Sequence, residues 1–302
     1  MKVVPAFAVT ATALLALTAC GSGDTATTSA GSRDRLEVSA AFYPLQWASE
    51  RIGGDHVVVS GLTKPGAEPH DLELTPKATA DLAASDVVLY LAGFQPAVDE
   101  AVETQAKDVG FDVAPHADLT LAPTADEAGA KDPHFWLDPV RLMKVSTAIG
   151  ERFAAADPAN AADYRAGATA LVKDLGALDD DFRTGLAQCR SDELVTGHAA
   201  FAYLADRYGL SQEGIAGINP DAEPDAATLR DLAAHVEEHG VTTIYTETLA
   251  SPALAETVAR ETGATTAVLD PIEGLTDASA GKDYLEVMRS NLATLRTGQQ
   301  CQ

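Results

Sequence analysis

The chain is organised around a short stretch that reads Asp132-Pro133-His134-Phe135-Trp136-Leu137-Asp138-Pro139. Proline fixes φ and biases the residue before it towards an extended conformation, so the backbone on both sides of His134 is stiff. The two neighbouring aromatic side chains can anchor the turn in a core, just before a helix begins. A stiff, anchored imidazole suits a metal site, because coordination geometry tolerates little slack. A core histidine at a turn is the alternative interpretation, and the rest of the chain decides between them.

Length and charge limit the classes of function. The chain has 302 residues, which indicates two domains, and it carries a formal net charge of −24 with a pI of about 4.4. A protein this acidic is not attracted to nucleic acid or to an anionic membrane surface. An acidic field concentrates cations, which suits a cation ligand, although the charge is equally explained as an aid to solubility.

The N-terminus predicts export and a lipid anchor. Residues 1–19 have a basic start and an apolar run, as in a secretory signal peptide, and are too short and interrupted for a transmembrane helix. The following Leu17-Thr18-Ala19-Cys20 resembles a bacterial lipobox, in which the cysteine is lipidated and becomes the first mature residue. Residues 20–35 then indicate a flexible tether. We therefore expect a domain held at the outer face of the cytoplasmic membrane, with an ordinary signal peptide as the alternative.

Two further cysteines, Cys189 and Cys301, remain after the tether. In an oxidising compartment an even number of cysteines is typically paired. Because Cys301 is the penultimate residue, a disulfide would hold a C-terminal tail that otherwise frays. We expect this disulfide rather than metal binding, since neither cysteine has a second cysteine near it in sequence.

Strand-like and helical patterns alternate in both halves of the chain. Between them lies a nearly unbroken helical stretch at residues 158–188, which would span on the order of 45 Å. The alternation predicts an α/β fold of two lobes with mainly parallel sheets, joined by one long rigid helix. The N-terminal lobe would cover residues 36–157 and the C-terminal lobe residues 189–302. No repeat is evident between the two halves of the sequence.

Four candidate metal ligands follow predicted strands. His70 lies in the loop after the second strand, His134 in the loop after the fourth, His198 just after the strand at 193–196, and Asp270 directly after the last strand. Ligands bind beyond the carboxyl ends of the strands in open α/β sheets. Two candidates come from each half, which predicts a site between the lobes. Three imidazoles and one carboxylate complete a tetrahedral shell for zinc.

Other polar residues give alternatives. Glu68, two residues before His70, and Glu247, at the end of a strand, are alternative oxygen ligands to Asp270, or groups that support the ligands. His235 and His239 have the i, i+4 spacing that can chelate a metal. We interpret that pair as structural, because His239 ends its helix, where an imidazole complements the helix dipole.

The chain resembles the metal-specific solute-binding proteins of bacterial ABC importers, the zinc and manganese receptors. The matching segments are Pro69-His70-Asp71-Leu72-Glu73-Leu74-Thr75-Pro76, the stretch 132–139, Thr196-Gly197-His198-Ala199-Ala200-Phe201-Ala202-Tyr203-Leu204, and Leu269-Asp270-Pro271. The resemblance implies metal ligands at His70, His134, His198 and Asp270. Manganese receptors often have glutamate at the third position, so His198 favours zinc. Many zinc receptors carry a His-rich loop before the second ligand, whereas residues 122–131 contain no histidine.

These observations predict a lipid-anchored, monomeric receptor that captures zinc outside the membrane and delivers it to the permease of an ABC importer, without catalysing a reaction. A manganese or iron receptor of the same fold is the alternative within that class. A secreted zinc-dependent hydrolase, with Glu68 as general base, is the alternative from another class, but the sequence has no His-Glu-x-x-His motif. The sequence does not distinguish a zinc receptor from a surface adhesin with the same fold.

Overall fold

The computed structural model describes residues 35–121 and 131–302. Residues 34–302 form one compact unit, distinct from residues 1–33. The predicted signal peptide, the lipidated Cys20, nearly all of the tether and residues 122–130 of the histidine-free loop lie outside the described residues.

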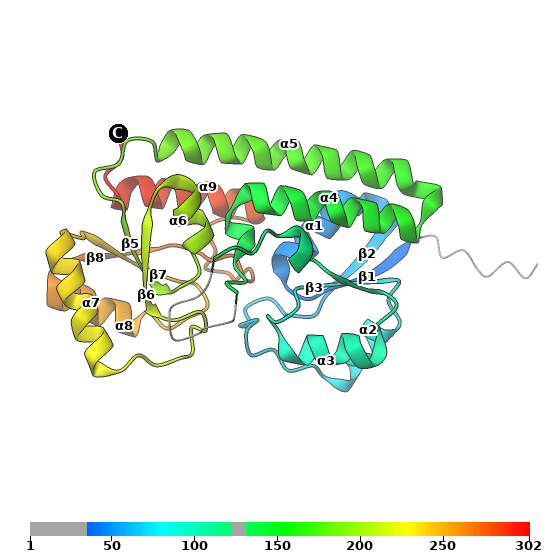
Figure 1. Ribbon diagram of the computed structural model, residues 1–302, viewed down its shortest axis with the longest axis horizontal. Helices are drawn as coiled ribbons and strands as arrows, with labels where there is room; N and C mark the ends of the chain where they lie inside the picture. Colours follow the sequence, from blue (N-terminus) through cyan, green and yellow to red (C-terminus); the bar gives the residue numbers. More distant parts are fainter. Residues whose placement is uncertain (1–34, 122–130) are drawn as a thin grey trace, which may run out of the picture. The chain divides into compact units, whose positions relative to one another are not determined.

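The N-terminal lobe is built on a parallel sheet with the strand order β2-β1-β3-β4. Its strands are β1 (Leu36–Ala40), β2 (Val57–Gly61), β3 (Val87–Tyr90) and β4 (Gly110–Asp112). Its helices are α1 (Tyr43–Gly53), α2 (Pro76–Ala83), α3 (Pro96–Gln105) and α4 (Pro139–Ala156). All four helices have a proline in their first turn, where no intrahelical N–H bond is lost. Helices α2 and α3 cover one face of the sheet, and α1 and α4 the other (Figure 1).

The C-terminal lobe repeats this arrangement with the strand order β6-β5-β7-β8, again parallel throughout. Its strands are β5 (Glu193–His198), β6 (Ser211–Ala216), β7 (Thr243–Thr246) and β8 (Thr265–Val268). Its helices are α6 (Ala202–Tyr208), α7 (Ala226–His239), α8 (Ala253–Thr262) and α9 (Tyr284–Gly298). Helix α7 begins at the cap Asp225 and ends at Gly240, whose φ of +63° suits glycine. In each sheet the strand order reverses beside the first strand, the position where open α/β sheets bind ligands.

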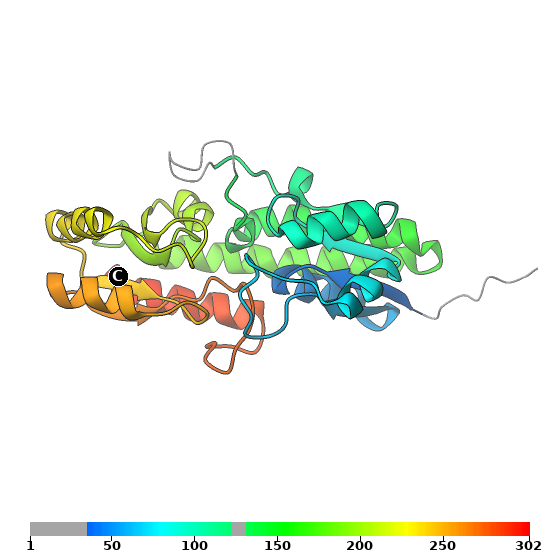
Figure 2. The ribbon, with the colours of Figure 1, turned by 90° about the horizontal axis from the view of Figure 1, so that it is seen from below.

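One long helix, α5 (Ala161–Gly185, 25 residues), runs from one lobe to the other and packs along α4 and α9 (Figures 1 and 2). A short 3-10 turn at Pro158–Asn160 precedes it. At 1.5 Å per residue the helix is about 37 Å long. The predicted fold class, two α/β lobes with parallel sheets joined by a long helix, is confirmed.

A continuous hydrophobic core connects the lobes. It contains residues of both sheets and of α5, among them Phe42, Trp136, Phe182 and Tyr203. Aromatic residues make several of the contacts that cross between the lobes: the Trp47 and Tyr284 rings stack with centroids 4.7 Å apart, the Tyr284 hydroxyl donates to the Trp136 carbonyl, and Trp136 Nε1 donates to the Pro271 carbonyl at 2.8 Å. Separating the lobes would expose this core to water, which disfavours a wide hinge opening.

A disulfide joins Cys189, just before β5, to Cys301 at the end of the chain, as predicted. The tail is also held by backbone hydrogen bonds from Cys301 N to the Arg296 carbonyl and from Gln302 N to the Gln188 carbonyl. The C-terminus is therefore attached to the start of the C-terminal sheet.

The double variant Cys189→Ser, Cys301→Ser is expected to lose about 2–4 kcal/mol of unfolding free energy, because the disulfide closes a long loop in the unfolded chain. The loop spans 112 residues. Urea denaturation of residues 34–302 measures the loss, and chemically reduced wild type should match the variant. An unchanged denaturation midpoint would contradict a stabilising role for this disulfide.

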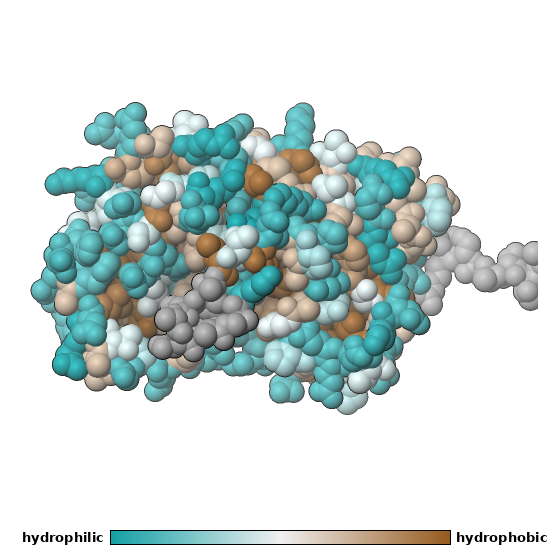
Figure 3. Space-filling view, in the orientation of Figure 1, coloured by the Kyte–Doolittle hydropathy of each residue, from teal (hydrophilic) through white to brown (hydrophobic). Residues whose placement is uncertain are grey.

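The surface is largely polar. Hydrophilic side chains cover most of the face in Figure 3, with smaller apolar areas between them. Among the described residues, only Leu254 and Val268 are large apolar side chains that are exposed. Within residues 35–121 and 131–302, no helix has both the length and the apolar composition that crossing a membrane requires.

Candidate metal centre

Three imidazoles and one carboxylate converge on one point between the lobes. Oxygen Oε1 of Glu273 lies 3.1 Å from Nε2 of His70, 3.0 Å from Nε2 of His134 and 3.4 Å from Nε2 of His198. Nitrogen Nε2 of His134 lies 3.3 Å from that of His70 and 3.4 Å from that of His198. Zinc with bonds of about 2.0–2.1 Å and tetrahedral angles places its ligand atoms about 3.3–3.4 Å apart. The four side chains therefore have the spacing of a tetrahedral zinc shell.

The fold positions these residues at the carboxyl ends of the strands. His70 lies in the loop after β2, and His134 lies between β4 and α4. His198 is the last residue of β5, and Glu273 lies in the loop after β8. Each lobe supplies two of the four side chains, so the cluster forms only when both lobes are folded and docked.

Asp132 fixes the orientation of His134. Its Oδ1 accepts the backbone N–H of His134 at 2.9 Å and lies 2.8 Å from ring Nδ1. The imidazole also packs against Trp136, with ring centroids 5.2 Å apart. A hydrogen bond from Nδ1–H to the carboxylate leaves the Nε2 lone pair directed at the centre, which is the usual support for a metal-binding histidine.

Glu247 supports His198 in the same way. Its Oε1 accepts the backbone N–H of His198 at 2.8 Å, and its Oε2 lies 2.5 Å from ring Nδ1. Residue 197 must be small here, since a Cβ on Gly197 would lie 2.7 Å from the Glu247 carboxylate. The sequence left two roles open for Glu247, an oxygen ligand of the metal or a group that supports a ligand. The geometry favours the second role, support of His198.

His70 is the member of the cluster nearest to solvent. It is 8% exposed, whereas His134 and His198 are fully buried. Its ring packs edge-on against Phe94, and its backbone N–H donates to Glu68 Oε1 at 2.9 Å. That oxygen is 4.0 Å from His70 Nε2, and Glu68 lies beside the cluster rather than in it.

The structure does not place Asp270 in the cluster, although the sequence suggested it as the fourth ligand. Its Oδ1 accepts the backbone N–H of Ile272 at 2.8 Å, and its Oδ2 accepts the Ser279 hydroxyl at 2.9 Å. Ile272 has a φ of +57°, which is strained for a β-branched residue. Asp270 therefore stabilises the turn that brings Glu273, three residues later, against the histidines.

The protonation of the cluster follows from burial and from these carboxylates. Burial lowers the pKa of His70. Burial also acts to lower the pKa of His198, but Glu247 and Glu273 outweigh it and raise that pKa to about 10. The three imidazoles hold the pKa of Glu273 well below its usual value despite burial. Without a metal ion, the cluster thus keeps protons on its histidine side next to an ionised Glu273. A bound metal ion would displace these protons.

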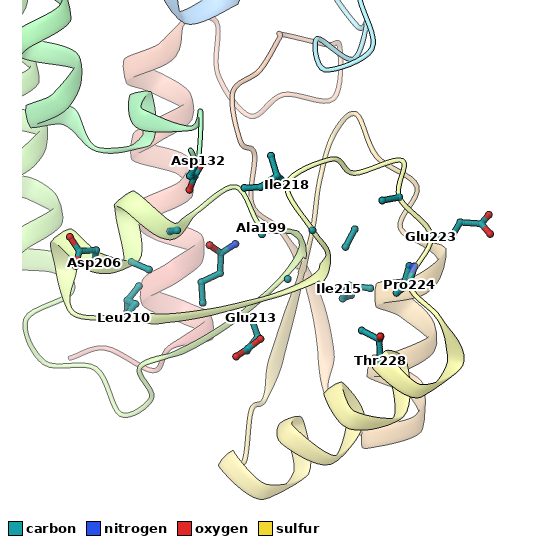
Figure 4. A pocket seen from close by; sticks show the side chains of 17 residues that line it. Asp132, Ala199, Asp206, Leu210, Glu213, Ile215, Ile218, Glu223, Pro224 and Thr228 are labelled. Carbon is teal, nitrogen blue, oxygen red and sulfur yellow. The ribbon is translucent and has the colours of Figure 1, made fainter. Parts of the chain in front are cut away.

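A cavity of about 720 Å³ opens beside the centre, lined mainly by the C-terminal lobe and by Asp132 of the N-terminal lobe (Figure 4). Asp132 lines it together with three further acidic residues, Asp206, Glu213 and Glu223. Among the described residues, Asp132 Oδ2 is buried without a hydrogen-bond partner. None of the four cluster side chains lines this cavity. At the centre itself the three imidazole nitrogens lie 3.0–3.4 Å from one Glu273 oxygen, a spacing that suits a single ion rather than an organic ligand.

Residues 38–298 match the family described as zinc-uptake complex component A, periplasmic (ZnuA). The chain is 35% identical over 277 residues to the zinc-binding lipoprotein AdcA of Streptococcus pneumoniae, covering 87% of this chain and 55% of that protein. It is 33% identical over 303 residues to the high-affinity zinc uptake system protein ZnuA of Bacillus subtilis, covering 95% of each. The chain thus spans about half the length of AdcA and nearly all of ZnuA.

Solved structures agree with these matches. The Zn(II)-bound ZnuA-like domain of S. pneumoniae AdcA has a TM-score of 0.74 at 35% identity, covering 88% of this chain and 99% of that domain. The laminin-binding protein Lmb of Streptococcus agalactiae, described as having adhesin and metal transporting activity, has a TM-score of 0.78 at 29% identity, covering 87% and 99%. From the family match over nearly the whole described chain, this protein belongs to the family of zinc-uptake complex component A, ZnuA.

Proposed function

We propose that this chain is the extracytoplasmic receptor of an ABC importer, which captures zinc and delivers it to the membrane permease. The observation that carries the proposal is the buried tetrahedral arrangement of His70, His134, His198 and Glu273, which we propose as the zinc ligands. Three imidazoles with one carboxylate suit zinc, whereas manganese favours more oxygen ligands. The names of AdcA and ZnuA support zinc as the transported ion.

The location follows from the N-terminal sequence and from the relatives. We propose that residues 1–19 are removed, that Cys20 carries the lipid, and that residues 20–35 tether the receptor to the outer face of the cytoplasmic membrane. The name of AdcA as a lipoprotein supports this anchor. The division into an N-terminal lobe (36–157), a connecting helix (158–188) and a C-terminal lobe (189–302) is part of the same proposal, as is a monomeric state.

Zinc would enter and leave on the side of His70, the least buried member of the cluster. The loop that carries His70 and Glu68 lies between β2 and α2 and has its own anchor, because Gln95 Nε2 donates to the Pro69 carbonyl at 3.0 Å. The continuous core and α5 restrict large lobe movements. We therefore propose that release needs a shift of this loop or a small adjustment between the lobes.

A hydrolase would need an open coordination position and a general base beside the metal-bound water. The cluster instead supplies four protein ligands, and Glu68 Oε1 already accepts the His70 backbone N–H. We therefore propose that the chain does not catalyse a reaction. The likeness to Lmb concerns the whole fold, which transport receptors share, so adhesion is not proposed here.

Elemental analysis tests the proposed function. Residues 34–302 would be dialysed against equal zinc and manganese, then against metal-free buffer to remove weakly held ions. One zinc per chain is expected, and His70→Ala should retain almost none. Manganese at one ion per chain would overturn the choice of metal, and no retained metal would overturn the receptor function.

The variant His198→Glu is expected to lower the preference for zinc over manganese, because a carboxylate replaces an imidazole and manganese favours oxygen ligands. Parallel titrations of both metals measure the ratio of dissociation constants. His116→Glu is the matched control, since His116 lies on the surface and stacks on Phe111. An unchanged ratio in His198→Glu would show that this position does not select the metal.

A further inference from the structure

A second group of metal-binding side chains lies in the C-terminal lobe. It consists of Glu193, the first residue of β5, and of His235 and His239 on the last turns of α7. The sequence interpretation treated the histidine pair as structural, because His239 ends its helix, and it did not consider Glu193, which is more than forty positions away in the chain. The fold brings this carboxylate against both rings.

The carboxylate of this group lies within ligand spacing of both imidazoles, through a different oxygen for each, and one ligand atom from each of the three residues lies within 4.8 Å of the others. Glu193 Oε2 lies 3.1 Å from His235 Nε2, and Glu193 Oε1 lies 3.4 Å from His239 Nδ1. Ligand atoms around tetrahedral zinc are about 3.3–3.4 Å apart. The two imidazoles lie one helical turn apart, with centroids 4.2 Å apart and planes inclined at 27°. One ion placed between the rings and the carboxylate would thus contact all three side chains.

Glu193 is rigidly held, as a metal ligand should be. Its backbone N–H donates to Ser191 Oγ at 3.3 Å, and its carbonyl accepts Gln299 Nε2 at 2.8 Å. Among the described residues, His235 and His239 are the only ion-pair partners of its carboxylate. Its side chain is 14% exposed, while that of His239 is 42% exposed, so the group is open to solvent on one side.

We propose that Glu193, His235 and His239 form a second site for zinc or a similar divalent transition metal ion. Three protein ligands leave one tetrahedral position for water. Strand β5 links this site to the buried centre, because Glu193 begins the strand and His198 ends it. Five residues of strand separate the two sites by about 16 Å. The second site is on the outer end of the C-terminal lobe, where α7 lies (Figure 1).

This site is open to solvent and has only three protein ligands. It should therefore bind a metal ion more weakly than the buried centre does. The net charge of the chain, −24, raises the local concentration of divalent cations around it. Calcium and magnesium prefer all-oxygen ligands, so the two imidazoles select against them. The site goes beyond the proposed transport function, and it would exist even if the buried centre held another metal.

Calorimetric titration tests the proposal. Residues 34–302 are first given one equivalent of zinc to fill the buried centre and are then titrated with more zinc. A second, weaker event of one zinc per chain is expected. His235→Asn and Glu193→Gln should each weaken that event by at least about tenfold, because each removes a ligand, and should leave the first event unchanged. The unchanged first event shows that the variants are folded.

Three controls separate a built site from general attraction of cations. His56→Asn removes an imidazole that faces a single carboxylate, Asp163, and should change nothing. Calcium in place of zinc should give no second event. His134→Ala, which damages the buried centre, should keep the weaker event. The proposal is overturned if wild type shows no second event, if the event survives His235→Asn and Glu193→Gln, or if calcium reproduces it.

Discussion

The variant His134→Ala is expected to bind zinc about 100- to 1,000-fold more weakly than wild type, since 10–16 kcal/mol shared over four ligands is about 3 kcal/mol per ligand. His134 is fully buried, and its Nε2 is within 3.4 Å of all three other donor atoms. Its loss removes a proposed ligand that lies close to every other member of the cluster. Competition with a chromophoric zinc chelator, on residues 34–302, measures the change.

His116→Ala is the matched control, because His116 also follows a proline and lies beside an aromatic ring, Phe111, but outside the cluster. It should bind zinc as wild type does. The thermal unfolding of metal-free His134→Ala should also be followed, because His134 packs on Trp136 in the core. A folded His134→Ala chain with wild-type affinity would refute the proposed ligand set.

The fold was predictable because two local features of the sequence determine it: the apolar patterns and the residues that end each element. Apolar runs of strand length alternate with helical patterns, and prolines and glycines stand at their ends, so the elements and the two lobes follow from the sequence. The repeated strand order of the two sheets was not predictable. It depends on which strands pair, and the strands of the two lobes share no sequence pattern that indicates it.

The three histidines were predictable because each lies at or after the carboxyl end of a strand, the edge of an open α/β sheet where ligands bind. Glu273 was not predictable as a member of the cluster. Its position in space depends on a turn in which Ile272 adopts a left-handed backbone conformation. Asn291 holds this turn by accepting the Asp270 N–H and donating to the Asp270 carbonyl, and Trp136 binds the Pro271 carbonyl. The one indication in the sequence was a charged residue within the otherwise apolar run Pro271-Ile272-Glu273-Gly274-Leu275.

The stretch around His134 connects ligand geometry to lobe docking. Its Asp132 orients the imidazole, and its Asp138 caps α4 and pairs with Arg207 of α6 in the other lobe. Its Trp136 contacts the turn that carries Glu273. The same eight residues therefore position proposed ligands from both lobes, which explains how a cluster shared between lobes keeps a tetrahedral spacing.

Replacing Glu273 by alanine is expected to weaken zinc binding by about as much as the loss of a histidine ligand, 100- to 1,000-fold by the same division of binding energy. Glu273 is 1% exposed, supplies the only carboxylate among the four proposed ligands, and lies within 3.4 Å of all three imidazoles. Its removal leaves three imidazoles as the proposed ligands, so no ligand atom carries a negative charge to balance the ion. Chelator competition again gives the affinity.

A matched pair of amide variants separates Glu273 from Asp270. Glu273→Gln removes the ligand charge and should weaken binding by more than about tenfold, the lower range for an outer-shell partner. Asp270→Asn keeps an oxygen for the Ile272 N–H and a polar group beside Ser279, so its affinity should fall by less than about tenfold. If Asp270→Asn were the weaker binder while both chains unfold at wild-type temperature, Asp270 would replace Glu273 as the fourth ligand. The proposed ligand set predicts the opposite order, because Asp270 builds the turn and Glu273 faces the three imidazoles.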